Sequence, residues 1–285
     1  MKNGGRKKKT RSNSAITINR NVKKTLGWKV VRSILITISF IILLLSRAFT
    51  ESADEKESKF NELVTKLRKD GYNVQYFYDK KFKIYINTQK NAEILNKANY
   101  FAPSFGIFTE VSFNQSIKFI DKFREQLLKA EKIYGVQKEY IVAILQVETN
   151  FGKRAGKQCV LNALASMYVY GRKWAYNEIK CYLDLESKLY TDPFEIKGSY
   201  AGAFGAAQAL PTSYKKFGVD FNEDGKIDPN DIEDAIGFVA NYLKECGFSK
   251  TLESKKQAVY SYNRQKSYID VIVKYANELK SKCIP

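Results

Sequence analysis

The stretch from Ile141 to Gly152 places a single glutamate, Glu148, at the end of an apolar helical pattern. Residues three, four and seven positions apart share one face of a helix, so Glu148 continues the stripe that Ile141 and Leu145 begin. Apolar surroundings and the negative end of the helix dipole both disfavour an ionised carboxylate. A carboxyl group that stays protonated near neutral pH can act as a general acid. The alternative is a glutamate at the edge of the core that pairs with a Lys or Arg residue.

The chain contains no histidine. This excludes Ser–His–Asp triads, Cys–His nucleophile pairs and metal sites with His ligands. Any reaction must therefore use carboxylates, amides and hydroxyls, which are the groups that cleave glycosidic bonds.

A stretch rich in small residues, Lys197 to Pro211, separates two helical patterns. Glycines at 198, 202 and 205 allow the backbone to approach another backbone or a ligand closely. Gln208 is the large polar side chain of this stretch and offers both a donor and an acceptor. No Gly-Lys-Ser/Thr ending follows, so it is not a phosphate loop. Tight packing between helices is the alternative explanation.

A second motif has the pattern of an EF-hand-type calcium loop. Asp220, Asn222 and Asp224 occupy its positions 1, 3 and 5, a glycine that permits the sharp turn follows, and the carbonyl of Lys226 is the expected backbone ligand. Position 12 is Asp231 in place of the usual Glu, and Asp234, one helical turn later, is an alternative bidentate ligand. With no partner loop in the sequence, we expect Ca²⁺ to act as a structural clamp and expect no organic cofactor. The alternative is a solvated acidic turn.

Four cysteines, Cys159, Cys181, Cys246 and Cys283, show no zinc-binding spacing. In an exported protein they permit two disulfides, in three possible pairings. We predict pairing within each half, Cys159 with Cys181 and Cys246 with Cys283. Buried thiols are the alternative.

The net charge of +18 is concentrated at one end of the chain. Residues 1–32 contain eleven Lys and Arg and no acidic residue, which leaves +7 for the remaining residues. We interpret residues 1–32 as a basic cytoplasmic leader. Since the folded part carries so little of the charge, nucleic acid is not an expected partner.

An apolar run, Ser33 to Ser46, follows the leader. It contains 14 uncharged residues, short for a membrane span of about 20 residues and suited to the hydrophobic region of a signal peptide. Residues 33–48 are therefore either a cleaved signal or an anchor in the inner membrane. Both routes export the rest of the chain to the periplasm.

The chain after residue 48 divides into two parts. Residues 49–100 form a predicted linker (49–60) and small extension, with a short helix over 60–69 and alternating strands over 72–87. Residues 101–285 form the predicted catalytic domain, which is mainly helical. Helical patterns cover residues 116–134, 138–149, 161–170, 174–190, 231–245, 255–262 and 268–280.

Blocks of sequence between about residues 105 and 280 resemble, in unbroken order, the membrane-bound lytic transglycosylase B family. They are Tyr134-Gly-Val, Ile141 to Gly152, Leu161 to Ala165, Lys197 to Gly205 with Gln208, Pro211 to Tyr214, Val219 through the calcium loop, Asp234 to Gly237, Val239 to Tyr242 and Tyr262 to Arg264. The resemblance implies a lysozyme-like helical (α+β) domain that binds peptidoglycan glycan strands as a monomer and cleaves the MurNAc–GlcNAc bond.

In that family a single glutamate acts first as an acid and then as a base, and Glu148 matches it. The resemblance implies that Glu148 protonates the glycosidic oxygen, that the substrate N-acetyl group stabilises the anomeric carbon, and that Glu148 then takes the proton of the C6 hydroxyl. The product is a 1,6-anhydro sugar. The residues that match substrate-contacting positions of the family are Ser199, Gln208, Tyr242, Tyr262, Asn263 and Tyr268.

Two departures from the family pattern bear on the site. Phe151 stands where a member of the family carries Trp, and residues 49–100 match no family block. The competing functions are a lysozyme-type muramidase, in which water attacks, and a catalytically inactive, calcium-stapled protein that binds the cell wall.

Overall fold

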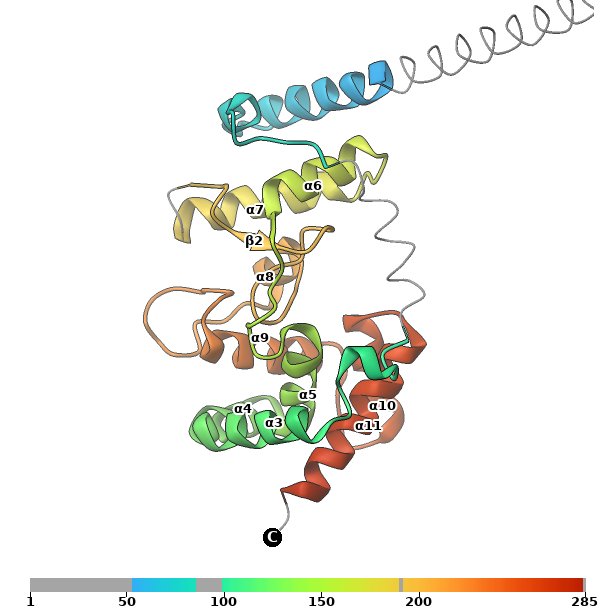
Figure 1. Ribbon diagram of the computed structural model, residues 1–285. Coiled ribbons are helices and arrows are strands. Elements are labelled where there is room, and N and C mark those ends of the chain that lie inside the picture. Colours follow the sequence, from blue (N-terminus) through green and yellow to red (C-terminus); the bar gives the residue numbers. More distant parts are fainter. Residues whose placement is uncertain (1–52, 86–98, 190–191, 284–285) are drawn as a thin grey trace, which may run out of the picture. The chain divides into compact units, whose positions relative to one another are not determined.

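The computed structural model describes residues 53–85, 99–189 and 192–283 (Figure 1). The chain divides into two compact units, Met1–Glu57 and Ser58–Pro285. The predicted leader and the apolar run at 33–48 lie outside the described residues. Among the helices that the structure describes, none is both long enough and apolar enough to cross a membrane.

The first described segment differs from the prediction. A helix spans residues 53–69, where a linker was expected up to residue 60, and it buries Leu63, Val64 and Leu67. The expected strands are also wrong, because the 3-10 helix η1 (Gln75–Tyr78) follows and 79–85 is irregular. The reason is a cluster of aromatic rings. The ring centroids of Phe77 and Phe82 lie 5.3 Å apart, and both rings pack on Phe60 of the preceding helix. Helix, turn and loop therefore belong to one packed segment.

The remainder is mainly helical, as predicted. Its helices are η2 (Pro103–Phe105), α3 (Glu110–Lys122), α4 (Arg124–Tyr134), α5 (Lys138–Thr149), α6 (Val160–Val169), α7 (Ala175–Leu189), α8 (Pro211–Phe217), α9 (Ile232–Glu245), α10 (Leu252–Tyr262) and α11 (Lys266–Lys282). A two-stranded antiparallel sheet joins β1 (Gln158–Cys159) to β2 (Lys197–Gly198). The compact unit begins at Ser58, so the extension packs with residues that were assigned to the catalytic domain.

One predicted helix, 116–134, is two helices in the structure. The chain bends at Phe123, whose φ of −111° and ψ of 33° are not helical, and α3 begins six residues earlier than expected. Thr109 caps α3 by accepting a hydrogen bond from the amide of Ser112 at 3.2 Å. The apolar spacing continues across Phe123 and no Gly or Pro marks the bend, so the sequence pattern concealed it.

The central helix is α5, which packs against α11, α3, α9 and α4. Every residue from Glu139 to Leu145 is buried, so the helix is enclosed on all faces rather than on a single stripe. A polar cluster anchors it: Gln146 donates to Ser112 at 2.9 Å, and the hydroxyls of Ser112 and Ser116 both bond Tyr275 of α11. In Figure 1, α3, α4 and α5 lie beside α10 and α11, while α6 and α7 lie together.

The cysteines are free thiols in the structure, and neither predicted disulfide is formed. Cys159 is buried, with its sulfur 4.0 Å from the carbonyl oxygen of Pro193, whereas Cys181 lies on α7. Cys246 ends α9 and Cys283 ends α11. Pairing within sequence halves failed because proximity along the chain does not place thiols on facing elements.

Candidate active site

Glu148 occupies the last turn of α5, and the chain after it is held in an unusual conformation. Asn150 (φ 50°) and Phe151 (φ 59°) are both left-handed, so the helix ends before Gly152, the predicted stop. The amides of these two residues satisfy the last carbonyls of the helix, at 2.9 Å and 3.0 Å. Left-handed backbone costs about 1 kcal/mol or more for each non-Gly residue, so the surrounding contacts must impose this geometry.

Thr149 supplies the main contact that fixes this helix end. Its hydroxyl donates to the carbonyl of Ala206 at 2.6 Å and accepts from the amide of Gly152 at 2.7 Å. The first bond joins α5 directly to the small-residue stretch. The position of Glu148 relative to that stretch is therefore set by its neighbour in sequence.

The carboxyl of Glu148 lies in a poorly solvated position but retains partial exposure. The hydroxyl of Tyr268, on α11, donates to its Oε1 at 2.6 Å. Burial raises the pKa of Glu148 to about 7, and the bond from Tyr268 opposes that rise. Among the described residues no Lys or Arg pairs with Glu148. This argues against the alternative of a salt-bridged glutamate at the edge of the core.

Three tyrosines surround the carboxyl. Burial and the charge of Glu148 raise the pKa of Tyr262 and Tyr268 well above the ordinary value, and raise that of Tyr100 to about 12. The ring of Tyr100 meets that of Tyr268 edge-to-face at 5.6 Å, and its hydroxyl bonds the side chain of Asn263. These hydroxyls stay protonated across the working pH range and can donate to a sugar or to the carboxylate.

Tyr100 was missed by the sequence analysis. It lies in an irregular segment before η2, where no periodicity indicates which side chain faces inward. The aromatic-rich sequence around it, Tyr100 to Phe108, was the available signal. Only the packing on α11 shows that it reaches the site.

The small-residue stretch approaches its neighbours as closely as the glycines predicted. A Cβ on Gly205 (φ 73°) would overlap the carbonyl of Pro229, and one on Gly156 would overlap the carbonyl of Gly198. Gln208 has a left-handed backbone (φ 47°). Its side-chain amide nitrogen donates hydrogen bonds to the backbone carbonyls of Ala155 and Gly205 at 2.9 Å and 3.1 Å. Its side chain thus braces two loops, and its carbonyl oxygen is the end left to face a ligand.

The other predicted contact residues fall into two groups. Tyr262, which donates to the carbonyl of Ala207 at 2.5 Å, and Asn263 lie with Tyr268 around Glu148. Tyr242 lies behind Tyr262, with ring centres 4.9 Å apart, and donates to the backbone. Ser199 turns toward its own loop, where its hydroxyl accepts the amides of Ala201 and Ala203. Among the described residues, no hydrogen bond joins Ser199 to Glu148.

Phe151 packs within the protein. Its ring stacks on Phe119 of α3 with centroids 4.1 Å apart and planes 14° apart. Phe151 therefore contributes to the packing between α3 and the end of α5.

The predicted calcium loop is ordered by its own side chains. The amide of Asp224 donates to oxygens of both Asp220 and Asn222 at 3.0 Å, so these two oxygens converge on one point. The amide of Gly225 (φ 89°) donates to the second oxygen of Asp220 at 2.8 Å, and space is open where its Cβ would lie. Carboxylate and amide oxygens are the ligand types that Ca²⁺ prefers, and here they accept backbone N–H groups of the loop.

The last two predicted ligands have other roles in the structure. Asp231 caps α9, accepting the amides of Glu233 and Asp234 at 2.7 Å and 3.1 Å. Asp234 is buried and accepts the amides of Phe221 and Asp228, each at 2.7 Å, one on each oxygen. Within the described ranges no three acidic or Cys side chains are grouped to hold a metal ion. The expectation that Asp234 is a free bidentate ligand is therefore not supported.

A comparison with protein-family models assigns the chain to a family. The sequence model described as "Transglycosylase SLT domain" matches residues 47–271, so the chain belongs to this family. The resemblance inferred from the sequence blocks is thereby confirmed. The matched residues include 49–100, which none of the sequence blocks had covered.

A curated protein of known name is similar to part of the chain. The chain is 40% identical over 145 residues to membrane-bound lytic murein transglycosylase B of Escherichia coli K12, a stretch that is 50% of this chain and 40% of that protein. The chain thus matches well under half the length of that curated relative.

Solved structures share the fold. The E. coli lytic transglycosylase Slt35 in complex with calcium superimposes with a TM-score of 0.71 at 22% identity, covering 80% of this chain and 94% of that one. SltB3 of Pseudomonas aeruginosa in complex with NAG-anhNAM-pentapeptide gives 0.66 at 18% identity, covering 79% of each chain. At these identities the likeness shows the fold.

Proposed function

We propose that this protein is a peptidoglycan lytic transglycosylase that cleaves the MurNAc–GlcNAc bond and leaves 1,6-anhydro ends. The observation that carries the proposal is the state of Glu148. A carboxyl with a pKa of about 7 is protonated often enough to give up a proton and ionised often enough to accept one. An enzyme that uses one residue as acid and then as base needs this balance.

The geometry suggests how the two steps divide between the carboxyl oxygens. Tyr268 holds Oε1, and among the described residues Glu148 has no second hydrogen-bond partner, so Oε2 is the oxygen that faces the substrate. Protonated Glu148 donates to the leaving glycosidic oxygen. The hydrogen bond from Tyr268 then stabilises the new carboxylate, because bonds to charged acceptors are the stronger ones. The carboxylate finally takes the proton of the C6 hydroxyl as the anhydro ring closes.

A second carboxylate does not assist within the described part of the chain. Burial and Tyr268 account for the pKa of Glu148, with no contribution from another acid. A retaining glycosidase needs a nucleophilic carboxylate about 5 Å from the acid, and such a pair would couple strongly. This supports participation of the substrate N-acetyl group in place of a protein nucleophile. Gln208, Tyr262, Asn263 and Tyr100 are proposed to contact the sugars.

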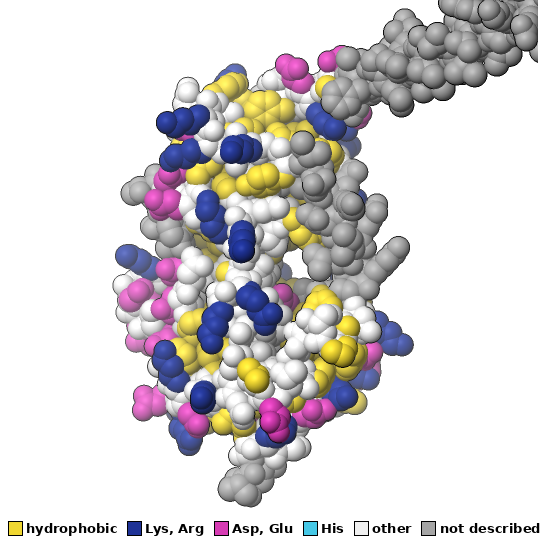
Figure 2. Space-filling view, in the orientation of Figure 1, with side chains coloured by type: hydrophobic (Ala, Val, Ile, Leu, Met, Phe, Trp, Pro, Cys, Tyr) yellow, Lys and Arg dark blue, Asp and Glu magenta, His cyan; other side chains and the backbone are white. Residues whose placement is uncertain are grey.

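The proposed substrate fits what similar proteins bind. SltB3 has been seen with NAG-anhNAM-pentapeptide and with NAG-NAM-pentapeptide, and E. coli Slt35 with bulgecin A. Lys and Arg side chains are spread over the visible face, with hydrophobic side chains between them (Figure 2). Such a surface favours weak, distributed attraction to a wall polymer that carries carboxylates.

Two further proposals concern the metal and the location. Calcium is present in the Slt35 complex, and we propose that Asp220, Asn222, Asp224 and the carbonyl of Lys226 hold a Ca²⁺ ion that clamps the loop. The similar E. coli enzyme is named as membrane-bound. We propose that residues 33–48 export this chain to the periplasm, either as a cleaved signal or as an inner-membrane anchor.

Product analysis tests the function directly. Purified protein is incubated with peptidoglycan sacculi and the soluble fragments are weighed by mass spectrometry. Anhydro ends support the proposal, whereas reducing ends would identify a muramidase that uses water. Glu148→Gln keeps the shape but removes the proton, and Glu245→Gln, at an exposed site, is the matched control. Equal release by Glu148→Gln and the parent protein would exclude the catalytic assignment.

A further inference from the structure

A hollow lined by several charged side chains lies beside the small two-stranded sheet. Its volume is about 520 Å³. Its wall consists of residues from the loop after η1, β1, the start of α6 and the segment before β2: Lys81, Lys83, Tyr85, Cys159, Asn162, Asp192, Phe194, Glu195 and Lys197. None of these residues takes part in the chemistry proposed for Glu148.

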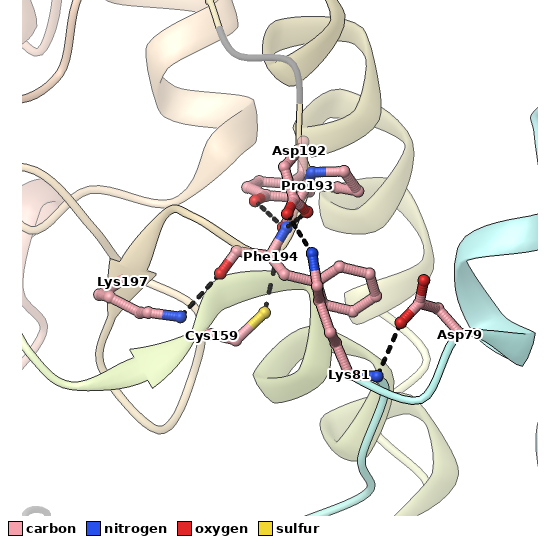
Figure 3. A network of polar contacts seen from close by, with 8 residues as sticks. Asp79, Lys81, Cys159, Asp192, Pro193, Phe194 and Lys197 are labelled. Atoms are coloured by element: carbon pink, nitrogen blue, oxygen red, sulfur yellow. Dashed lines mark hydrogen bonds and ion pairs between the residues drawn. The ribbon is translucent and has the colours of Figure 1, made fainter.

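The wall is built rather than accidental, because two residues of α6 fix the loop that forms it. Asn162 donates to the carbonyl of Lys81 at 3.1 Å, and the hydroxyl of Ser166 accepts the amide of Tyr85 at 2.8 Å. Lys81 closes the hollow with an ion pair to Asp192 at 2.5 Å, and Asp192 also accepts the amide of Phe194 (Figure 3). The loop and the segment before β2 are thereby joined across the hollow.

Several polar groups of this wall have hydrogen-bonding capacity that the described residues do not use. Asn162 is 2% exposed, and its side-chain oxygen has no partner among the described residues. Tyr85 accepts the amide of Cys159 at 3.2 Å, and the described residues offer its own hydroxyl proton no acceptor. An unpartnered buried acceptor is uncommon in a folded protein and marks a place where a donor is expected.

The charged side chains of the wall are also only partly paired among the described residues. Lys81 and Asp192 neutralise each other. Lys197 donates one of its three protons, to the carbonyl of Phe194 at 2.7 Å, and Lys83 has no ion pair among the described residues. Two ammonium groups therefore remain for an anion, next to the carboxylate of Glu195 in the wall and that of Asp79, which acts on Lys81.

We propose that this hollow binds a short peptide that carries free carboxylates. Lys83 and Lys197 would receive a carboxylate, the hydroxyl of Tyr85 would donate to a peptide carbonyl, and a small turn of the Asn162 amide would let its oxygen accept a peptide N–H. A simple inorganic anion would leave the acceptor and Glu195 without partners, so the donor and acceptor set matches a peptide better. This deepens the proposed function and rests on it, because the peptides attached to peptidoglycan strands have this chemistry.

The hollow adjoins the small-residue stretch, because Lys197 lies in its wall and begins that stretch. Lys197 is two residues before Ser199, so their Cα atoms are at most about 7 Å apart. A glycan strand in the Glu148 site could therefore place its attached peptide in the hollow. The hollow would then select strands that still carry peptides over bare glycan.

The test compares two probes on the full chain carrying Glu148→Gln, so that neither is cleaved: the NAG-NAM-pentapeptide and the NAG-NAM disaccharide. We expect the pentapeptide to bind more tightly. The double change Lys83→Gln with Lys197→Gln should weaken pentapeptide binding by about tenfold, as two partly exposed charge pairs allow, and leave disaccharide binding within about twofold. Added salt should weaken the pentapeptide advantage in the parent and not in the double variant.

The control is Lys118→Gln with Lys132→Gln, which removes the same charge at exposed positions on α3 and α4. Equal pentapeptide affinity in the parent and the Lys83/Lys197 variant, or an equal loss in the control, would overturn the peptide site while the proposed function stands. If the disaccharide does not bind even the parent, the proposed function fails. The free pentapeptide then decides the peptide site by itself: binding that the double variant loses supports it, and no binding overturns it.

Discussion

Removing the hydroxyl of Tyr268 should raise the pKa of Glu148 and move the pH dependence of the enzyme. In the parent, Tyr268 donates to Oε1 at 2.6 Å and lowers a pKa that burial has raised to about 7. A hydrogen bond to a charged group is worth about 1.5–3 kcal/mol, and one pKa unit corresponds to about 1.4 kcal/mol. Tyr268→Phe should therefore raise the pKa by about one to two units.

The direction of the change in rate follows from the role of the group. Glu148 must be protonated to act as the acid, so activity is lost as the pH rises through its pKa, and this loss should move from about pH 7 to about pH 8–9. The maximal rate should fall about ten- to a hundredfold, because the carboxylate formed in the reaction loses its stabilising bond. Neighbouring tyrosines titrate well above this range, so the limb reports Glu148.

The assay is the rate of peptidoglycan release from pH 4 to pH 10, with the melting temperature measured at each pH. Tyr275→Phe is the matched control, because Tyr275 is a buried tyrosine of the same helix that bonds Ser112 and Ser116 instead. A limb that stays in place in Tyr268→Phe, or that moves to lower pH, would refute the reasoning. So would an equal shift in Tyr275→Phe.

Three further changes test the energetics. Glu148→Gln should stabilise the fold by up to about 3 kcal/mol above pH 7 and by little at pH 4. The reason is that the pKa of this carboxyl is raised from 4.5 to about 7 in the folded state, so the parent protein loses stability as the pH rises between those values. Denaturant unfolding at both pH values measures the difference. Chelation of calcium should lower the melting temperature of the parent by several degrees and should have no effect on Asp220→Ala. An ion bound only by the folded state stabilises it by about 2.7 kcal/mol when the free ion concentration is a hundred times the Kd. Identical melting of the parent with and without chelator would contradict the proposed calcium clamp. Gly205→Ala should destabilise the fold by about 2 kcal/mol or more, because its Cβ overlaps a backbone carbonyl at positive φ, and an unchanged denaturation midpoint would contradict that packing.

The site could be predicted from the sequence only in part. Local pattern located Glu148, since an apolar helix that ends in one carboxylate is readable from spacing alone. The family resemblance named Tyr262, Asn263 and Tyr268, and the structure brings them to the carboxyl. It could not show that Ser199 turns to its own loop or that Tyr100 enters from an irregular segment, because side-chain direction in loops depends on distant partners.

The sequence by itself determined the helical character of the chain, the glutamate at the end of α5 and the family to which the domain belongs. These follow from periodicity, composition and ordered motifs, which are local properties. The tertiary structure decided that the chain bends at Phe123 between α3 and α4, that residues 53–69 form a packed helix, that the four cysteines are free thiols, and that Asp234 holds two backbone amides. Each of these depends on which surfaces meet across the fold, since burial and hydrogen bonding between distant residues outweigh local preference.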